Sequence, residues 1–547
     1  MNKKLKIILI SIGLTIAAVI VLAASKADIY AEIMKSQRLV NNVYKNLIVN
    51  YVDDFDIEAF TRMSIEDMVG ELDPYTVFIE ADDRHSLDLL TTGKYGGVGL
   101  QIGKREGRLT VIAPMDDTPA KRAGITNGDI IVKIDSTFTD ELNLDVASDI
   151  IRGLKGTKVI LTIERFGNEE LIEFELTRAN IIVKDVAYAE MIEDNIGYIR
   201  LSRFSKNSGP EMRKTLNKFM ENDESAIILD LRNNPGGLLG SSIEVLEMFV
   251  QKDQLLLTTK GRNKESNRSI YSKHAPIIPE EIEIIVLINE GSASASEIVA
   301  GTLQDLDRAV IMGRRSYGKG LVQSVVGLDK DHALKITTAK YYTPSGRLIQ
   351  KPGYINEKLV IAKGDEDTTF ATVGGRIVKA GGGIEPDFEV KVEYNYPLTY
   401  ECLRKGAFFS YVQKHKQSYT SLQELKKDTQ LLDNFQNYLV DIELEVITTG
   451  EKAFGDTKEK LSEIDSTNTE LIAAFDVIEE FIENHEDTLF ENEKEKLTEF
   501  LYDEFASVYE GESGRFREQL KYDQTVNKAL IILQNNTVYN SVFAVDN

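Results

Sequence analysis

A segment of small residues, Asn289–Glu297, contains three serines, and Lys319 follows the middle one, Ser294, after 25 positions, between two glycines. This pairing predicts hydrolysis in which a lysine, rather than a histidine, activates a serine hydroxyl. A free lysine has a pKa of ~10.4 and is a poor base at neutral pH, but burial in apolar surroundings disfavours its charged form. A neutral amine within hydrogen-bond reach of a hydroxyl can then take its proton. Activity is therefore expected to rise with pH as the lysine loses its proton.

Both halves of this pair also have ordinary structural explanations. Ser294 and Glu297 match the S-x-x-E capping box that many helices use at their start. Lys319 between glycines is equally typical of a solvated loop lysine. Ser292 and Ser296 flank Ser294, and the residues alone allow either of them to be a cap or a supporting hydrogen-bond donor.

Three further segments help to decide between the catalytic and the structural interpretations of Ser294 and Lys319. An apolar run that ends in Asp-Leu-Arg, residues 227–232, predicts a buried strand, and Asn-Pro-Gly-Gly at 234–237 predicts a tight turn after it. Glycines in such a turn let backbone N–H groups approach a ligand closely. The other segments are residues 95–102, with 117–131 downstream, and residues 333–347, with 383–387 downstream.

In this order, the segments resemble the carboxy-terminal processing proteases, also called tail-specific proteases, of peptidase family S41. The resemblance covers about two-thirds of the chain, roughly residues 28–392. It implies a serine endopeptidase with Ser294 as nucleophile, Lys319 as general base and Gln323 as the residue that orients the base. It further implies an oxyanion hole from the N–H of Ala295 and of either Gly236 or Gly237, with supporting acidic positions at Glu297 and Asp305.

The resemblance also implies a PDZ domain that captures the C-terminal tails of substrate proteins. In a PDZ groove an extended peptide adds as a β-strand, and loop N–H groups hold its terminal carboxylate. The residues that match this loop and strand are Gly96, Gly97, Val98, Gly99 and Leu100, with Ile102 as a further pocket wall. The alternative is that these glycines only make a turn.

The expected fold class is α/β and multidomain. We expect a signal-anchor or transmembrane segment at 1–27, a helical region at 28–92, the PDZ domain at 93–181, a crotonase-like α/β protease core at 182–392 and a helical domain at 393–547. Within the core, the segment 353–382 is expected to be an irregular insertion.

Hydrophobic periodicity predicts the main elements. Strands are expected at 109–113, 130–134, 159–163, 196–201, 227–231, 284–288 and 310–312. Helices are expected at 145–154, 211–220, 241–250, 294–306, 421–444, 458–484, 493–509 and 516–533.

The composition narrows the classes of partner. A net charge of -24 and a pI near 4.9 argue against nucleic-acid binding and against a polybasic membrane patch. The single cysteine, Cys402, excludes an intramolecular disulfide, and its apolar neighbourhood predicts a buried structural thiol. The five histidines lie in no paired-ligand pattern, so we expect neither a metal nor another cofactor.

Near the N-terminus, Lys3, Lys4 and Lys6 precede an uncharged, mostly aliphatic run over residues 7–25. This pattern predicts a retained membrane anchor, with a cleaved signal peptide as the alternative. The positive charges place the rest of the chain outside the cytoplasm, on the periplasmic or cell-surface side of a bacterial-type cell. A homodimer and an adaptor or activator protein are left open. The alternative function is a non-catalytic PDZ scaffold or tail-binding chaperone with a degenerate protease fold.

Overall fold

The computed structural model describes residues 30–80, 92–105, 107–221, 225–330, 332–351, 368–391, 396–464 and 466–544. These residues belong to two compact units that divide between Phe78 and Ile79. The first unit is helical over residues 30–50 and in α2 (Ile57–Gly70), and the short strand β1 (Val77–Ile79) follows. Asp56 caps α2 by accepting the backbone N–H groups of Glu58 and Ala59. The helical prediction for this region is confirmed over the residues described.

The second unit begins with a small β-rich domain. Its sheet has the order β3-β4-β5-β7-β8, with β6 on β5, and β2 pairs separately with β9. The elements are β2 (Lys94–Gly97), β3 (Leu100–Arg105), β4 (Arg108–Pro114), α4 (Pro119–Ala123), β5 (Ile130–Ile134), β6 (Thr137–Phe138), α5 (Leu144–Ile151), β7 (Lys158–Glu164), β8 (Ile172–Thr177) and β9 (Ala179–Ile182). The predicted strands and the helix of this region are confirmed, with small shifts at their ends.

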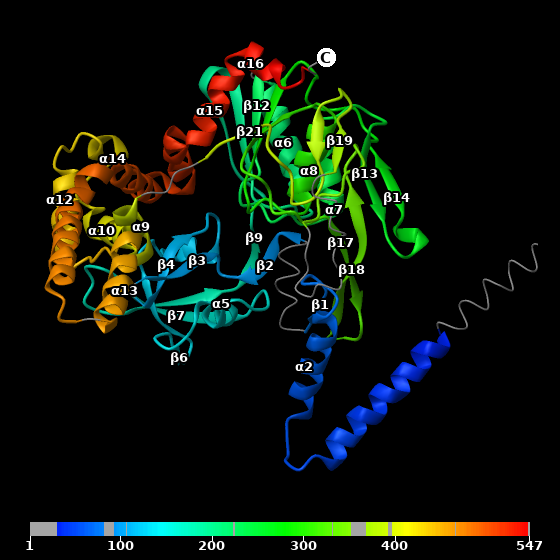
Figure 1. Cartoon of the computed structure of the whole chain (residues 1–547), viewed down its shortest axis with the longest axis horizontal. Helices are drawn as coiled ribbons and strands as arrows, with labels where there is room; N and C mark the ends of the chain where they lie inside the picture. The colour runs from blue at the N-terminus through cyan, green and yellow to red at the C-terminus, as the bar shows by residue number, and fades with distance from the viewer. Residues whose placement is uncertain are drawn as a thin grey trace, which may run out of the picture. The chain divides into compact units, whose positions relative to one another are not determined.

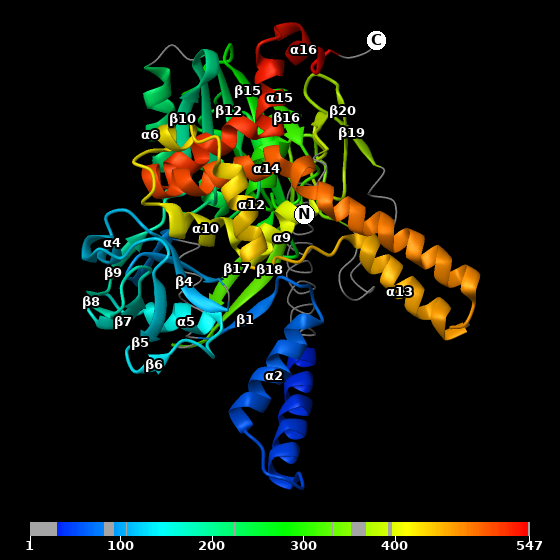
Figure 2. The same cartoon turned by 90° about the vertical axis from the view of Figure 1, so that its left-hand side faces the viewer.

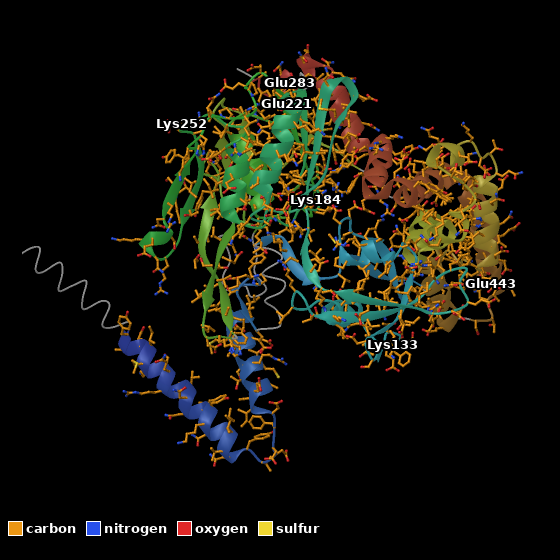
Figure 3. All side chains as sticks on the ribbon, turned by 180° about the vertical axis from the view of Figure 1, so that it is seen from behind. Lys133, Lys184, Glu221, Lys252, Glu283 and Glu443 are labelled. Carbon is orange, nitrogen blue, oxygen red and sulfur yellow. The ribbon has the colours of Figure 1, made fainter. Side chains whose placement is uncertain are left out.

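A mostly parallel sheet forms the centre of the second unit. Its order is β10-β11-β12-β15-β16-β21, in which only β10 runs antiparallel to its neighbour. The strands are β10 (Val186–Ile192), β11 (Ile196–Leu201), β12 (Ala226–Asp230), β15 (Glu283–Ile288), β16 (Val310–Gly313) and β21 (Phe388–Glu389). Glu221 and Glu283, labelled in Figure 3, lie at the edge where β12 and β15 begin. The carboxyl ends of the parallel strands meet at the opposite edge.

Helices cover both faces of this sheet, as strands buried on both sides require. One face packs against α6 (Ser208–Met220), α7 (Leu239–Leu246) and α8 (Ala295–Asp305). The other face packs against α15 (Gln524–Leu533) and α16 (Asn536–Ser541), at the far end of the sequence. Neighbouring residues of β12 show the division, since Ile227 faces the first layer and Ile228 the second. Figure 1 shows α15 and α16 beside β12.

A second, antiparallel sheet follows the core strands in sequence and includes the order β17-β18-β13-β14. Its strands are β13 (Leu255–Lys260), β14 (Arg268–Tyr271), β17 (Leu321–Gly327) and β18 (Ala333–Tyr342). Two 3₁₀ turns, Glu193–Asn195 and Lys264–Ser266, lie in the connections. The segment expected to be irregular at 353–382 contains a hairpin of β19 (Thr369–Ala371) and β20 (Ile377–Lys379).

The C-terminal region is helical, as predicted, but its helix boundaries differ from the prediction. It contains α9 (Pro397–Lys405), α10 (Ala407–His415), α11 (Leu422–Leu425), α12 (Leu431–Asp441), α13 (Thr449–Ile464) and α14 (Thr469–Tyr522), before α15 and α16. Gly511 has a non-helical φ of 70° and interrupts α14. Figure 2 shows α13 beside the first part of α14, where Phe454 packs on Phe475. Cys402 is fully buried in the core of this region, and burial raises the pKa of its thiol.

The expected membrane segment at 1–27 lies outside the described residues. Across the part of the chain that the structure describes, no helix is long and apolar enough to cross a membrane.

Candidate active site

Three loops at the carboxyl edge of the parallel sheet carry the residues singled out from the sequence. The loop after β12 holds Gly236 and Gly237, the loop after β15 holds Ser294, and the loop after β16 holds Lys319. Because β12, β15 and β16 are adjacent and parallel, their carboxyl ends lie side by side. Ligand sites of open α/β sheets lie at this edge. The fold therefore gathers residues that are up to 83 positions apart, Gly236 and Lys319, around one place.

Ser294 stands at the N-cap of α8 with a backbone φ of 53°. A non-glycine residue in this left-handed region costs of order 1–3 kcal/mol, and such strain is concentrated at functional sites. The next residue, Ala295, opens the helix, where the first backbone N–H groups have no partner within the helix. Ser294 and Glu297 also form the capping box that the sequence suggested. The structural and catalytic interpretations of this motif are thus compatible.

The two flanking serines are used for structure. Ser292 is buried, and its Oγ donates to the Leu231 carbonyl at 2.7 Å. Ser296 is buried too, and its Oγ donates to the Asn234 carbonyl at 2.8 Å. Both bonds attach the serine loop to the glycine loop. Ser294, by contrast, is only half-buried and lines a cavity.

Glu297 holds the serine loop and the lysine loop together. Its Oε2 accepts the backbone N–H groups of Ser294 and Lys319, both at 2.8 Å. Its Oε1 accepts the Gly318 N–H and the Ser316 hydroxyl, both at 2.6 Å. Complete burial raises the pKa of Glu297, and these four donors act in the opposite direction by stabilising the carboxylate. Its geometry supports a positioning role.

Lys319 is half-buried, and the backbone on either side of it has room only for glycine. Gly318 has a φ of 89°, and a Cβ at Gly320 would lie 2.8 Å from the Gln350 backbone nitrogen. The Tyr341 hydroxyl bridges the two loops, at 2.5 Å from the Lys319 carbonyl oxygen and 3.1 Å from that of Ser294. Tyr341 therefore ties the same two loops as Glu297 does.

Gln323 lies on β17, four residues after Lys319. Its side-chain nitrogen donates to Thr337 Oγ1 on the neighbouring strand β18 at 3.3 Å. The β17–β18 pairing thus fixes the amide on the wall of the cavity that Lys319 also lines.

The two candidate glycines for the oxyanion hole are not equivalent. The Gly236 N–H donates to Asn234 Oδ1 at 2.9 Å. Among the described residues, no hydrogen bond is made by the Gly237 N–H. A Cβ at Gly236 would lie 2.8 Å from the Ala295 nitrogen, so this glycine allows the two loops to touch. The geometry favours the N–H groups of Gly237 and Ala295 as the pair of donors.

These residues line one cavity of about 340 Å³. Its polar wall contains Ser294, Lys319 and Gln323, and both glycines and Ala295 also line it. Its apolar wall is formed by Leu238, Leu239, Ile298, Leu321, Val322 and Val325. The cavity is large enough for an apolar side chain next to the serine. This arrangement can support serine-based acyl transfer with a lysine as the base.

Glu297 and Asp305 are the predicted site residues of the core that do not line this cavity. Glu297 bonds to the backbone of Ser294 and Lys319, whereas Asp305 lies far from both. It lies at the other end of α8, eleven residues from Ser294, or ~16 Å at 1.5 Å per residue. It is fully buried, pairs with Arg347 at 2.8 Å and accepts the Ser345 N–H at 2.9 Å. Its surroundings support a structural role at the far end of the helix.

Three residues that support the site were not singled out from the sequence, namely Asn234, Asn289 and Tyr341. Asn234 sits in the Asn-Pro-Gly-Gly turn, and its Nδ2 donates to the Leu201 carbonyl at 2.7 Å. Asn289 Oδ1 accepts the backbone N–H groups of Asn233 and Gly291, at 2.8 and 3.1 Å. The paired asparagines before Pro235 were the available indication, because asparagine side chains commonly bond to nearby backbone.

The peptide-binding residues predicted in the small β-rich domain lie at one edge of its sheet. Gly96 and Gly97 end β2, Val98 and Gly99 connect to β3, and Leu100 begins β3. Strand β3 is an edge strand and packs beside α5, as strand addition of a peptide requires. Gly99 has a φ of 79°, and its carbonyl accepts the Met115 N–H at 2.9 Å. The glycines thus shape a loop at the start of an unpaired edge.

Comparisons with known proteins find relatives of this chain. A family model described as Peptidase family S41 matches residues 195–357, a PDZ domain model matches 110–165, and a model described as Probable PDZ-protease, C-terminal helical domain matches 398–533. The carboxy-terminal-processing protease of Bartonella bacilliformis is 38% identical over 316 residues, which are 57% of this chain and 72% of the relative. The carboxyl-terminal-processing protease of Synechocystis sp. is 36% identical over 347 residues, 60% of this chain and 80% of the relative. Among solved structures, a photosystem II D1 C-terminal processing protease is 28% identical with a TM-score of 0.36, over 63% of this chain and 85% of that one.

Proposed function

Because this chain belongs to the carboxy-terminal processing proteases of peptidase family S41, and is a serine-type peptidase with a PDZ domain, we propose that it cleaves proteins whose free C-terminal tails its PDZ domain captures. Ser294 is the nucleophile and Lys319 is the general base. The observation that carries this assignment is the convergence of three strand-end loops on one cavity that contains both side chains.

The reaction follows from this arrangement. Neutral Lys319 takes the proton of the Ser294 hydroxyl while the Ser294 oxygen attacks the scissile carbonyl carbon. The N–H groups of Ala295 and Gly237 donate to the oxyanion that forms, and removing one such donor in other enzymes costs about 10²–10³-fold in rate. The protonated lysine then gives its proton to the leaving amine as the C–N bond breaks, which leaves an acyl-enzyme.

Hydrolysis of the acyl-enzyme repeats these steps with water. Lys319 takes a proton from a water molecule as the water oxygen attacks the ester carbonyl. The C–O bond to Ser294 breaks, the serine oxygen regains the proton, and the new C-terminus leaves. Gln323 orients the base, and Glu297 fixes the backbone of both loops.

Tail capture is proposed for the edge of β3 in the PDZ domain. A peptide in extended conformation would pair with β3, next to α5, while backbone N–H groups of the loop at 96–100 hold its carboxylate. The substrates are then polypeptides with a free C-terminus.

The proposed location is the outer side of a bacterial-type cytoplasmic membrane, with the segment at 1–27 as the anchor. Support comes from the sequence, in which three lysines precede the uncharged run at 7–25. The domain limits 93–181, 182–392 and 393–547 are proposed with it. A homodimer and an adaptor protein stay open.

The test uses the purified full-length chain and an unstructured protein with an apolar tail, either with a free terminus or with an amidated one. Ser294→Ala and Lys319→Ala are each expected to abolish cleavage, and amidation is expected to slow cleavage by the unmodified enzyme. Two matched controls are Ser269→Ala, an exposed serine on β14, and Lys335→Ala, a second lysine that lines the cavity. Both controls should keep activity. Cleavage by Ser294→Ala, or loss with Lys335→Ala rather than Lys319→Ala, would refute the assignment, and tail binding without cleavage would favour a scaffold.

A further inference from the structure

The glycine loop after β12 is held from two sides. On the inner side, the asparagines of the loop bond to the serine loop. Asn233 and Asn289 exchange two hydrogen bonds, since the Asn233 N–H donates to Asn289 Oδ1 at 2.8 Å and Asn289 Nδ2 donates to Asn233 Oδ1 at 2.9 Å. The Asn234 carbonyl accepts the Ala293 N–H at 3.0 Å. These bonds join Asn233 and Asn234 to the backbone close to Ser294.

On the outer side, the loop is held by an ion-pair network around Asp230. Asp230 is fully buried at the end of β12. Arg232 donates to Asp230 through Nε and Nη2, at 3.0 and 2.6 Å to its two oxygens, and Arg200 donates to it at 3.2 Å. The Tyr198 hydroxyl donates to it at 2.6 Å. Burial raises the pKa of Asp230, but the two arginines more than offset this, and the pKa lies below its ordinary value.

The last member of the network comes from the C-terminal helices. Asp523 accepts from Arg232 Nη1 at 3.0 Å and from Arg232 Nη2 at 2.7 Å, so one guanidinium bridges two carboxylates. Two arginines and two aspartates make the group neutral, and removal of the Asp523 charge would leave one positive charge in excess. Paired, charge-assisted hydrogen bonds of this kind are directional and fix a guanidinium in place.

Asp523 is also the N-cap of α15, where its Oδ1 accepts the backbone N–H groups of Thr525 and Val526. Helix α15 packs on the far face of the parallel sheet, as Figure 1 shows. The aspartate is therefore fixed by a helix that belongs to the C-terminal region and that contacts the core on the side away from α8.

We propose that Asp523 is a positioning residue for the peptidase reaction, and that through Arg232 the C-terminal helical region holds the oxyanion loop 232–237 against the Ser294 loop. This inference deepens the proposed function and rests on it. Catalysis by the core would then require the C-terminal helices, although none of the side chains described in them lines the cavity.

The test compares three variants of the full-length chain. Asp523→Asn removes the charge but keeps a good N-cap residue. Asp523→Glu keeps the charge. Arg517→Gln is the matched control, because the Arg517–Glu190 pair at 3.2 Å also joins the C-terminal helices to the core but does not touch the glycine loop.

With a short peptide that lacks a tail, Asp523→Asn is expected to lower kcat by about tenfold with little change in KM, the pattern of a lost transition-state interaction. Asp523→Glu should restore most of kcat, and Arg517→Gln should keep it. A second readout needs no activity: in the Ser294→Ala background, Asp523→Asn should speed amide hydrogen exchange of residues 230–238, and Arg517→Gln should not.

The outcomes separate the inference from the proposed function. An unmodified enzyme without peptidase activity refutes the proposed function, and the exchange measurement still tests the link from Asp523 to the loop. Unchanged kcat in Asp523→Asn, equal losses in Asp523→Asn and Arg517→Gln, or a loss of kcat without faster exchange at 230–238 would each overturn the inference.

Discussion

Glu297 shows how one buried carboxylate can fix two loops. An ionised carboxylate only accepts hydrogen bonds, and here all four donors point at it. In Glu297→Gln the amide keeps one acceptor oxygen, and its NH₂ group faces two donors. We expect kcat to fall about 100-fold, since hydrogen bonds to charged groups contribute about 1.5–3 kcal/mol each. Steady-state kinetics and thermal melting check this. Glu290→Gln, an exposed acid in the same loop, is the control and should behave as the unmodified enzyme.

Gly236 is expected to tolerate no side chain. Its φ is 96°, and a Cβ would lie 2.7 Å from the Ala293 carbonyl oxygen and 2.8 Å from the Ala295 nitrogen. Gly236→Ala should separate the two loops and lower kcat/KM by at least about 100-fold, the scale of losing an oxyanion donor. Gly240→Ala is the matched control, because a Cβ at Gly240 in α7 meets no atom within 4 Å. Wild-type activity in Gly236→Ala would show that the loops do not need this contact.

The sequence predicted the residues that meet in the cavity better than those that hold them. Ser294, Lys319 and the glycine turn each stand in a local motif, so their spacing was informative. Tyr341 joins the site only because β18 pairs with β17 and ends beside the lysine loop. The exchange between Asn233 and Asn289 exists only because β12 neighbours β15. Asp305 shares a helix with Ser294 but lies at its other end. Strand order and helix length decide such contacts, and local patterns do not contain them.

At the scale of elements, the parallel core was predictable and the C-terminal helices were less so. Short aliphatic runs marked β11, β12, β15 and β16, because strands buried on both faces must be apolar throughout. In α14, by contrast, the helix continues through residues 485–492, where we expected a break. That segment contains neither glycine nor proline, the residues that most disfavour a helix interior, so it contained no strong signal that ends a helix. The predicted helix end at 509 is close to Gly511, whose non-helical backbone interrupts α14.

Within α14, Asp503 is buried and should make stability depend on pH. Burial raises the pKa of Asp503 to about 7, and the like charges of Glu504 and Glu518 add to this, while Gln519 and Arg515 act in the opposite direction. The folded state therefore binds a proton between about pH 4 and pH 7 that the unfolded state has released. This contribution to stability is fully present below about pH 4 and is lost as pH rises through 7.

Asp503→Asn should remove that dependence. At pH 8 we expect the variant to be more stable than the unmodified chain by up to about 4 kcal/mol, which is ~3 pKa units at 1.36 kcal/mol each. Near pH 4 the two should be alike. Calorimetric melting at pH 4, 6 and 8 measures the difference, with Glu491→Gln, an exposed acid of the same helix, as the control. A stability difference that does not change with pH would contradict the assignment.

At the scale of the molecule, the C-terminal helices contact both the core and the PDZ domain. Asp523 reaches the glycine loop, whereas α10 and the residue after it reach the PDZ loop at 126–129. Lys416 Nζ donates to the Asn127 carbonyl at 3.2 Å and to Gln413 Oε1 at 2.8 Å. Nothing in the sequence indicated these contacts, since they join residues 289 positions apart and use ordinary polar side chains. The order of the domains was readable from motifs, and their attachment to one another was not.

The contact between Lys416 and the PDZ domain should matter for tailed substrates alone. A tail held by the PDZ domain raises the effective concentration of the scissile segment at the cavity only while the domain is held near the core. Lys416→Ala loosens that attachment, because the Asn127 carbonyl and Gln413 Oε1 would lose their donor. We expect KM for a tailed protein to rise by about 3- to 10-fold, with unchanged kinetics on a short peptide without a tail.

Fluorescence anisotropy should give the same affinity for an isolated tail peptide, because the β3 edge is untouched. Lys414→Ala is the matched control, since that lysine lies over the Tyr438 ring within the helical region. Equal effects of Lys416→Ala on both substrates would show that the helical region acts on the chemistry rather than on the placement of the PDZ domain.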